Sequence, residues 1–357
     1  MNWLFKLRGE LSQSQSTILG ILGLLVFLLI WMFVTMGESP MVSSGILPSP
    51  MKVLKSYGDL SVDNDLVKNT FFSIGLNIAG YFKAIIFSII FGFLIGLYPI
   101  FRGMFKNHIE ALRFVPIAAA IGLFIVWYGS QTSMKVNFLA FGIIIFLLPV
   151  VVARIDEVKS VYLKTVHTLG ATDWQVIRTV YIPSVFSRLF DDIRILTAIS
   201  WTYIVFAEGV ASQGGIGYLT FAVRRFGRID KLFALLILIL IIGLIQDRVF
   251  KYLDKVFFPH KYQTKSKYSD ELEEPSYVEV IFDFVFKIGV WILLGIYLVL
   301  ALGEFTSILG GRAPLSYFFQ DTVWAIHTIF VIIVAYKANQ LWKHFKAKPI
   351  QTVVANA

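Results

Sequence analysis

Long apolar stretches separated by short polar segments dominate the sequence. We predict eight membrane-spanning helices from them, because most are close to the roughly 20 residues that a helix needs to cross a hydrocarbon core of about 30 Å. The predicted spans are 18–36, 71–98, 114–128, 134–153, 190–210, 232–250, 280–303 and 320–337. The third span is short and carries Pro116 near its start. The pattern therefore predicts an all-α polytopic membrane protein.

A polar segment, residues 154–188, lies between the fourth and fifth apolar stretches, and its pattern is helical. Apolar positions recur at three- and four-residue steps until Gly170, where a left-handed residue can end a helix. Thr172 and Gln175 fit a capping box, so a second short helix is predicted, and Pro183 is expected to end it. This helix, glycine turn and helix could dock into a groove of another protein. The alternative interpretation is a solvated interfacial loop.

The composition excludes a soluble domain. Hydrophobic residues make up 57% of the 357 residues, charged residues only 15%, and the mean hydropathy is +0.73. The chain has no cysteine, which excludes disulfides and thiolate metal sites, and its 5 histidines lack metal-ligand spacing, so we expect no metal site. The net charge of +9 is interpreted through its distribution along the loops rather than as a sign of nucleic-acid binding.

The charge distribution predicts the topology. With the N-terminus in the cytoplasm, the cytoplasmic segments hold more than twice as many Lys and Arg residues as the outer ones, which favours two cytoplasmic termini. The loop 209–231 disagrees, because it is basic and would lie outside. We keep this topology because the segment 154–188 and the C-terminal tail outweigh that loop.

The segment 154–188 resembles the coupling loop in the permease subunits of binding-protein-dependent ABC importers. The signature of that loop is Glu-Ala-Ala, three residues, Gly, nine residues, Ile, one residue, and Leu-Pro. Gly170 stands at the glycine position, and Val180, Ile182 and Pro183 follow at signature spacing. Lys164 begins the triplet that replaces Glu-Ala-Ala, so the charge is reversed and the family's glutamate contact cannot be carried over. The resemblance implies a role in ATPase coupling for Lys164, Gly170, Ala171, Thr172, Asp173, Trp174 and Pro183.

Other motifs resemble the branch of this family that transports nitrate, sulfonates and taurine. They are the LPSP step at 47–50, Pro116 with the Trp-Tyr-Gly step at 127–129, the Ala-Glu pair at 207–208, and Gly-Ile-Gly-Tyr-Leu at 215–219. Each motif is weak alone, but together they occur in family order. The resemblance implies a type I ABC importer-like transmembrane core over residues 47–259, with the coupling helices at 158–183.

The rest of the chain departs from this branch. Residues 1–46 are interpreted as an N-terminal anchor span with the start of an outer loop, and residues 260–279 as a charged cytoplasmic linker. Residues 280–357 would form an appendage of two spans with a basic tail, and nothing in their sequence names a partner.

Polar and aromatic residues in or beside the spans are candidates for the substrate pathway. They are Asn77, Lys83, Trp127, Tyr128, Trp201, Glu208, Arg224 and Arg225. Lys83 could attract an anion as a buried cation or could snorkel to an interface, and Trp127 and Tyr128 could instead belong to an interfacial aromatic belt. Glu208 is a pathway or gating candidate by default, and an ion pair with Arg224 or Arg225 is the competing interpretation.

The resemblance implies the membrane subunit of an ATP-driven importer in the bacterial cytoplasmic (inner) membrane, moving a small and anionic solute of the nitrate, sulfonate or bicarbonate class. The chain has no G-x-x-x-x-G-K-[ST] motif, so ATP and magnesium would be bound by a partner ATPase in two copies. A second permease copy, in a homodimer, and an extracytoplasmic substrate-binding protein complete the implied assembly. Two alternatives stay open at this point: an ATP-independent channel or secondary transporter, and a membrane scaffold that transports nothing.

Overall fold

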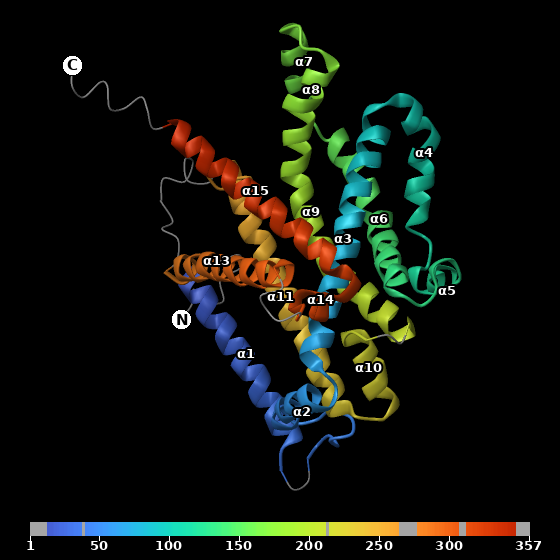
Figure 1. Cartoon of the computed structure of the whole chain (residues 1–357), viewed down its shortest axis with the longest axis vertical. Helices are drawn as coiled ribbons and strands as arrows, with labels where there is room; N and C mark the ends of the chain where they lie inside the picture. The colour runs from blue at the N-terminus through green and yellow to red at the C-terminus, as the bar shows by residue number, and fades with distance from the viewer. Residues whose placement is uncertain (1–12, 38–39, 212–213, 264–276, 307–311, 348–357) are drawn as a thin grey trace, which may run out of the picture.

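The computed structural model describes residues 13–37, 40–211, 214–263, 277–306 and 312–347, and the described part of the chain contains helices and no strand (Figure 1). Seven helical segments are long and apolar enough to cross a membrane, or eight if one bent pair is counted as a span. The predicted all-α polytopic class is therefore confirmed. The predicted linker falls mostly on residues 264–276, which lie outside the described residues, as do residues 1–12 and 348–357 of the predicted anchor and tail.

The N-terminal half of the chain contains six helices. These are α1 (Gln13–Thr35), α2 (Pro50–Asp63), α3 (Leu66–Leu97), α4 (Pro99–Leu112), α5 (Ile117–Tyr128) and α6 (Thr132–Asp156). The second half contains α7 (Ser160–Thr168), α8 (Asp173–Val176), a π-helical turn η1 (Ile177–Tyr181), α9 (Ile182–Ala211), α10 (Ile216–Arg225), α11 (Ile229–Phe257), α12 (His260–Gln263), α13 (Tyr277–Phe305), α14 (Pro314–Phe319), a 3₁₀ turn η3 (Gln320–Thr322) and α15 (Val323–Ala347). Helices α7 and α8 project at one end of the bundle and α10 lies at the other, and we call these the α7–α8 end and the α10 end (Figure 1).

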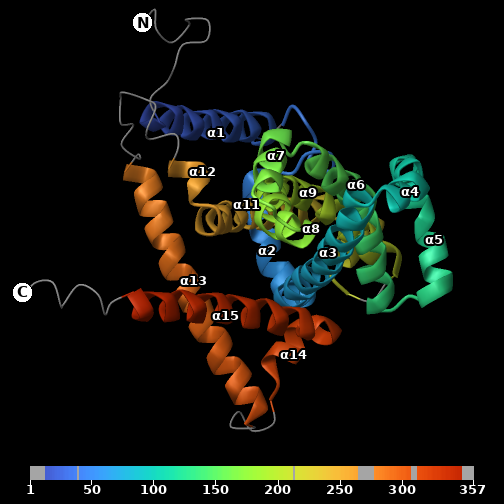
Figure 2. The same ribbon diagram turned by 90° about the horizontal axis from the view of Figure 1, so that it is seen from above.

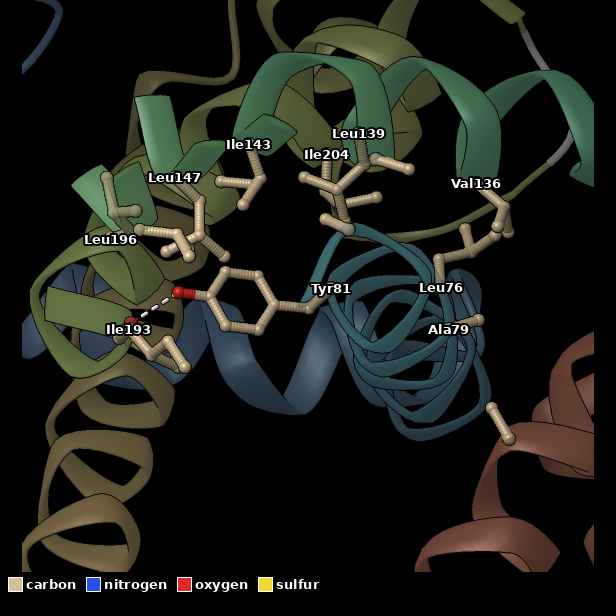
Figure 3. Packing of buried hydrophobic residues seen from close by; sticks show 14 of the residues in the cluster. Leu76, Ala79, Tyr81, Val136, Leu139, Ile143, Leu147, Ile193, Leu196 and Ile204 are labelled. Atoms are coloured by element: carbon tan, nitrogen blue, oxygen red, sulfur yellow. Dashed lines mark hydrogen bonds between the residues drawn. The ribbon is translucent and has the colours of Figure 1, made fainter. Parts of the chain in front are cut away.

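The core of the bundle is the contact of α3 with α6 and α9. Small residues on α3 allow this contact, because a Cβ atom at Gly92 would lie 2.5 Å from Val151, and one at Gly96 would lie 2.5 Å from Ile155. The two glycines thus form the small-residue face that their four-residue spacing predicts. Figure 3 shows the apolar side chains that fill the space between the three helices, with the Tyr81 hydroxyl donating a hydrogen bond to the Ile193 carbonyl of α9.

The predicted span 114–128 is not an independent span. Helix α5 has 12 residues, about 18 Å of helix, which is too short to cross a membrane. It follows α4 after a break, and the two helices are bent by 108°. Pro116 lies in the break, where its ring disfavours a helical conformation for the preceding residue. The bend between α4 and α5 is that of a broken span or a re-entrant loop.

The predicted helix end at Pro183 is also wrong. The helix continues through Pro183, so that α8, η1 and α9 form one helical segment from Asp173 to Val210. In the π-helical turn just before the proline, the N–H of Ile182 bonds the carbonyl of Ile177, five residues back. A wider turn accommodates a ring that would collide with the preceding carbonyl in a regular α-helix. The polar segment is therefore continuous with a membrane span.

The C-terminal helices lie beside the core, and α15 crosses α13 in the view of Figure 2. They contact the core at α3, where a Cβ atom at Gly75 would lie 2.2 Å from Thr322 Oγ1 and the Phe71 ring meets those of Phe318 and Phe319. They also contact α11, where the Tyr252 and Phe257 rings meet those of Phe286 and Tyr336. Most apolar side chains of α13 are exposed along the helix, as expected for a surface that faces lipid. The appendage thus packs on the first half of α3 and on α11.

We expect Gly92→Val to destabilise the protein by about 1–3 kcal/mol, because the added side chain must displace Val151 in a packed interface. Thermal unfolding of the purified protein in detergent measures the effect. Gly122→Val is the matched control, since Gly122 has open space around its Cβ position. Equal melting temperatures for the two variants would contradict the close α3–α6 contact.

Candidate functional site

The turn between α7 and α8 has the geometry that the sequence predicts. Gly170 has a φ of +75°, in the left-handed region that favours glycine, and the N–H of Ala171 bonds the carbonyl of Val166. The capping box of α8 is confirmed: Thr172 Oγ1 accepts from the N–H of Gln175, and Gln175 Oε1 accepts from the N–H of Thr172 at 2.8 Å. The glycine and the capping box together thus define the turn between α7 and α8.

The surface of this helix pair is apolar and unusually exposed. Leu169 is 81% exposed and Trp174 66%, and Val161 and Tyr162 on α7 are exposed as well. No residue of α7 is buried, and Lys164 lies on its exposed surface. Apolar side chains that project in this way from the end of a molecule mark an interaction site. We call the group Val161, Tyr162, Leu169 and Trp174 the apolar knob.

Ion pairs join the segment between α6 and α7 to the bundle. The Arg154 guanidinium, at the end of α6, donates two hydrogen bonds to Asp192 of α9, at 2.7 and 2.8 Å, and also bonds Glu157. Arg188 Nη1 lies 3.1 Å from the same Glu157. These arginines, Arg154 first, hold the pKa of the Glu157 carboxyl below its ordinary value. The loop is thus connected electrostatically to both helices that flank it.

A second polar centre lies at the α10 end, around the fully buried Glu208. Its carboxylate accepts hydrogen bonds from Ser73 Oγ at 2.6 Å and from the N–H of Gly217 at 2.7 Å. Ser73 Oγ in turn accepts from the N–H of Ile216, and Asn69 Oδ1 accepts from that of Gly215. Three consecutive N–H groups at the start of α10 are therefore bonded by side chains of α3 and α9. The interpretation of Glu208 as an ion-pair partner of Arg224 or Arg225 is wrong, because its partners are these uncharged donors.

The buried cation near this centre is a lysine that the sequence interpretation missed. Lys83 is exposed on α3 and donates to Asn137 Oδ1, so the hypothesis of a buried cation there is wrong. Lys135, in the first turn of α6, is fully buried, and its Nζ has no hydrogen-bond partner among the described residues. The Nζ lies 5.1 Å from the centroid of the Phe72 ring and interacts electrostatically with Glu208. The available signal was its position inside the predicted span 134–153, because ionisable residues within spans face the bundle interior.

The other pathway candidates separate into buried and exposed groups. Asn77 is buried and donates to Ser200 Oγ at 2.9 Å, and Trp201 is buried and donates to Gln246 Oε1 at 2.7 Å. Trp127 and Tyr128 are exposed at the end of α5 and pack on Phe124. Their exposed position is the one that an interfacial aromatic belt requires.

Two neighbouring cavities open on the face formed by α9 and α10. One, of about 490 Å³, is mostly apolar and includes Trp201, Tyr203 and Phe221 in its lining. The other, of about 610 Å³, shares Phe221 and is lined by Tyr218, Arg224 and Arg225. Both arginines are exposed, and neither forms an ion pair with a described residue. The structure thus brings Trp201 and the two arginines to one face, while Lys83, Trp127 and Tyr128 contribute nothing to either cavity lining.

No cluster of three or more His, Cys, Asp or Glu side chains suited to a metal ion occurs in the part of the chain that the structure describes. The described features are a multi-pass helical bundle, an exposed apolar knob at one end of a continuous helix, and a buried polar centre near the other end. They define a polytopic helical membrane protein with an exposed surface suited to a partner.

The sequence comparisons identify the family. Residues 84–258 match the family described as the inner membrane component of binding-protein-dependent transport systems. A probable ABC transporter permease of Brucella melitensis is 30% identical over 59% of this chain and 85% of its own length. The chain belongs to this family of ABC transporter permeases, as its motifs indicate.

Two further relatives confirm the branch that the motifs indicate. The taurine transport system permease TauC of Escherichia coli is 26% identical over 68% of this chain and 88% of its own length. A putative aliphatic sulfonates transport permease, SsuC of Bacillus subtilis, is 25% identical over 64% of this chain and 83% of its own length. The chain is thus a multi-pass inner-membrane permease similar to those of taurine and sulfonate systems.

Proposed function

We propose that the chain is the transmembrane subunit of an ATP-driven ABC importer that moves a small anionic solute by alternating access. The observation that carries this proposal is the exposed apolar knob on the continuous helix Asp173–Val210. The knob docks into a groove of a separate ATPase subunit, which binds ATP and magnesium. The α7–α8 end is then cytoplasmic, and so are both termini.

The continuous helix provides the mechanical connection. Its 38 residues correspond to about 57 Å, enough to link the docking surface at Trp174 with Glu208 near the opposite end. The ion pairs of Arg154 with Asp192 and Glu157 make α6 move together with α9 and with the start of the segment that leads to α7. A displacement of the knob by ATP-driven closure of the ATPase therefore reaches the face that carries the two cavities.

The charge of the larger cavity supports an anionic solute. Arg224 and Arg225 line it without a carboxylate partner among the described residues, next to the Tyr218 ring. A guanidinium binds sulfonate, nitrate or carboxylate oxygens through directed N–H groups, and an aromatic wall suits an apolar substrate chain. Relatives named for taurine and aliphatic sulfonates are consistent with this assignment.

The complete importer contains two copies of this chain as a homodimer, two ATPase copies and an extracytoplasmic substrate-binding protein. The residues proposed to act in coupling are those of the knob together with Lys164, Gly170, Ala171, Thr172, Asp173 and Pro183. Lys164 places a positive charge on the docking surface, and we expect the ATPase groove to be acidic there.

Gly170→Val is predicted to weaken binding of the ATPase, and so to uncouple transport from ATP hydrolysis, in a protein that still folds. Valine at a φ of +75° costs about 1–2 kcal/mol, so the turn rearranges and the knob is lost, although there is open space around the residue. A detergent pulldown of the tagged chain from its native membrane, with mass spectrometry, measures ATPase recovery. We expect recovery to fall about tenfold or more for Gly170→Val and for Trp174→Ala.

The control is Gly103→Val, at an exposed glycine in α4 that also has open space but helical backbone. It should recover as much ATPase as the unmodified chain. Recovery of no ATPase by the unmodified chain, in a preparation that keeps other membrane complexes intact, would reject the importer function and favour a channel or a scaffold.

Arg224→Gln and Arg225→Gln are each predicted to raise the KM for an anionic substrate by about tenfold or more, because each removes charge-assisted hydrogen bonds. Uptake of radiolabelled taurine or an alkanesulfonate by proteoliposomes that contain the complete importer measures this effect. The difference from the unmodified protein should shrink as salt increases. Lys55→Gln, at an exposed lysine of α2, is the control, and an equal effect of all three variants would show that only the total charge matters.

A further inference from the structure

Helix α10 is held at its N-terminal end by three side chains of other helices. The N–H groups of Gly215, Ile216 and Gly217 are bonded by Asn69, Ser73 and Glu208, at 2.7, 2.8 and 2.7 Å. These donors have no partner within α10, so the contacts satisfy groups that would otherwise be orphaned inside the protein. The Glu208 carboxylate also lies at the positive end of the α10 dipole. Docking of α10 is therefore centred on the buried side chain of Glu208.

Close approach of the backbone makes this docking specific. A Cβ atom at Gly215 would lie 2.3 Å from the Glu208 carboxylate, and one at Gly217 would lie 2.3 Å from the carbonyl of Val205. Only glycine lets the start of α10 reach α9 so closely. The same short helix carries Arg224 and Arg225 at its other end, beside the larger cavity.

Lys135 is a buried charged group near this centre whose charge the contacts of the described residues do not explain. It is fully buried, its Nζ has no hydrogen-bond partner among the described residues, and it interacts electrostatically with Glu208 without reaching it. Its place in the first turn of α6 is unfavourable for a cation, because the helix dipole is positive there. The face of the Phe72 ring offsets part of this cost. An uncharged side chain of equal length would fill the space more favourably, so packing does not account for the charge.

We propose that Lys135 is a positioning residue for transport, which pairs with Glu208 when α10 withdraws from α3 and α9. Glu208 thereby exchanges partners: in the docked arrangement it accepts from Gly217 and Ser73, and in the withdrawn arrangement it accepts from the Lys135 ammonium. The exchange is non-covalent and moves no proton.

The exchange gives the two arrangements comparable free energies. Withdrawal of α10 alone would leave a buried carboxylate without its donors, which is strongly unfavourable. The docked arrangement leaves Lys135 unpaired instead. The docked state satisfies the N–H groups of α10 and leaves Lys135 unpaired, whereas the withdrawn state pairs Lys135 and takes the acceptors from those N–H groups. Such a balance is what a bistable element requires. In the importer, which is the function proposed above, this motion would open and close the arginine-lined cavity.

The test measures withdrawal of α10 directly. The chain has no cysteine, so Val223→Cys introduces a single thiol. Val223 is buried on α10 in the cluster with Leu219 and Leu235, and its thiol is labelled by a membrane-impermeant maleimide only when α10 withdraws. We expect Lys135→Met to slow labelling of this cysteine about tenfold in membranes, because the withdrawn state loses its ion pair. On a Glu208→Gln background, which has no carboxylate for Lys135 to pair with, Lys135→Met should cause little further slowing.

Lys68→Met on the same background is the control, since Lys68 also lies near the α10 end of α3 but contacts the Tyr317 ring. Its labelling rate should equal that of the parent. An unchanged or faster rate in Lys135→Met, or independent additive effects of the two substitutions, would overturn the proposal and leave Lys135 as a strained core residue. If Lys135→Met does not accumulate in membranes, the double variant Lys135→Met with Glu208→Gln is labelled instead. A labelling rate of Val223→Cys equal to that of the parent would then overturn the proposal.

A second measurement separates this proposal from the proposed function. The labelling rates need no ATPase, so they test the exchange even if the pulldown recovers none. With the ATPase in proteoliposomes, ATP and vanadate should change the labelling of the parent by several-fold and that of Lys135→Met much less. If ATP and vanadate do not change the labelling of the parent, while the rates in membranes are as expected, then Glu208 exchanges partners in a protein that ATP does not drive.

Discussion

The uninterrupted helix from Asp173 to Val210 is the constraint on which the rest of the structure depends. It carries Trp174 of the apolar knob at one end and Glu208 near the other, so a displacement of either end is transmitted along a rigid element. The helix can continue through Pro183 only if the proline ring avoids the preceding carbonyl. The π-helical turn at Ile177–Tyr181, just before the proline, makes room for the ring. A regular α-helix would break or kink at this point, and the knob would then be only loosely connected to the bundle.

The bundle around this helix is stabilised mainly by close packing, because lipid provides no hydrophobic drive for helix association. Glycines at positions 80, 92 and 96 let α3 approach α6 so closely that added Cβ atoms would collide with Leu139, Val151 and Ile155. The ion pairs of Arg154, Arg188 and Arg194 lie at the opposite end from the buried polar centre and join α9 to α6 and α11. Packing thus sets the spacing of α3 and α6 along their contact, and ion pairs add links from α9 to α6 and α11.

The sequence predicts those features that depend on local pattern. The spans follow from apolar length, the turn at Gly170 from the need for a left-handed residue, and the start of α8 from Thr172 and Gln175, because these are properties of a few adjacent residues. The errors arise where distant segments decide the outcome. Pro183 signals a helix end in sequence, but a π-turn accommodates it, and the 12 residues of α5 pass for a span although they complete a broken element with α4.

In the candidate site, too, contacts between distant segments decide what local pattern cannot predict. Lys83 and Lys135 are both lysines in apolar surroundings, and sequence alone favours Lys83 because it lies deep within its predicted span. The direction in which each helix faces determines which lysine is buried. Lys83 is on the exposed face of α3, whereas Lys135 is on the face of α6 that meets Phe72. Likewise, the Gly-Ile-Gly step at 215–217 resembles a family motif in sequence, but only the structure gives its physical reason. The N–H groups of these three residues bond Asn69 and Ser73 of α3 and Glu208 of α9, and no local pattern in the chain predicts that distant residues supply these acceptors.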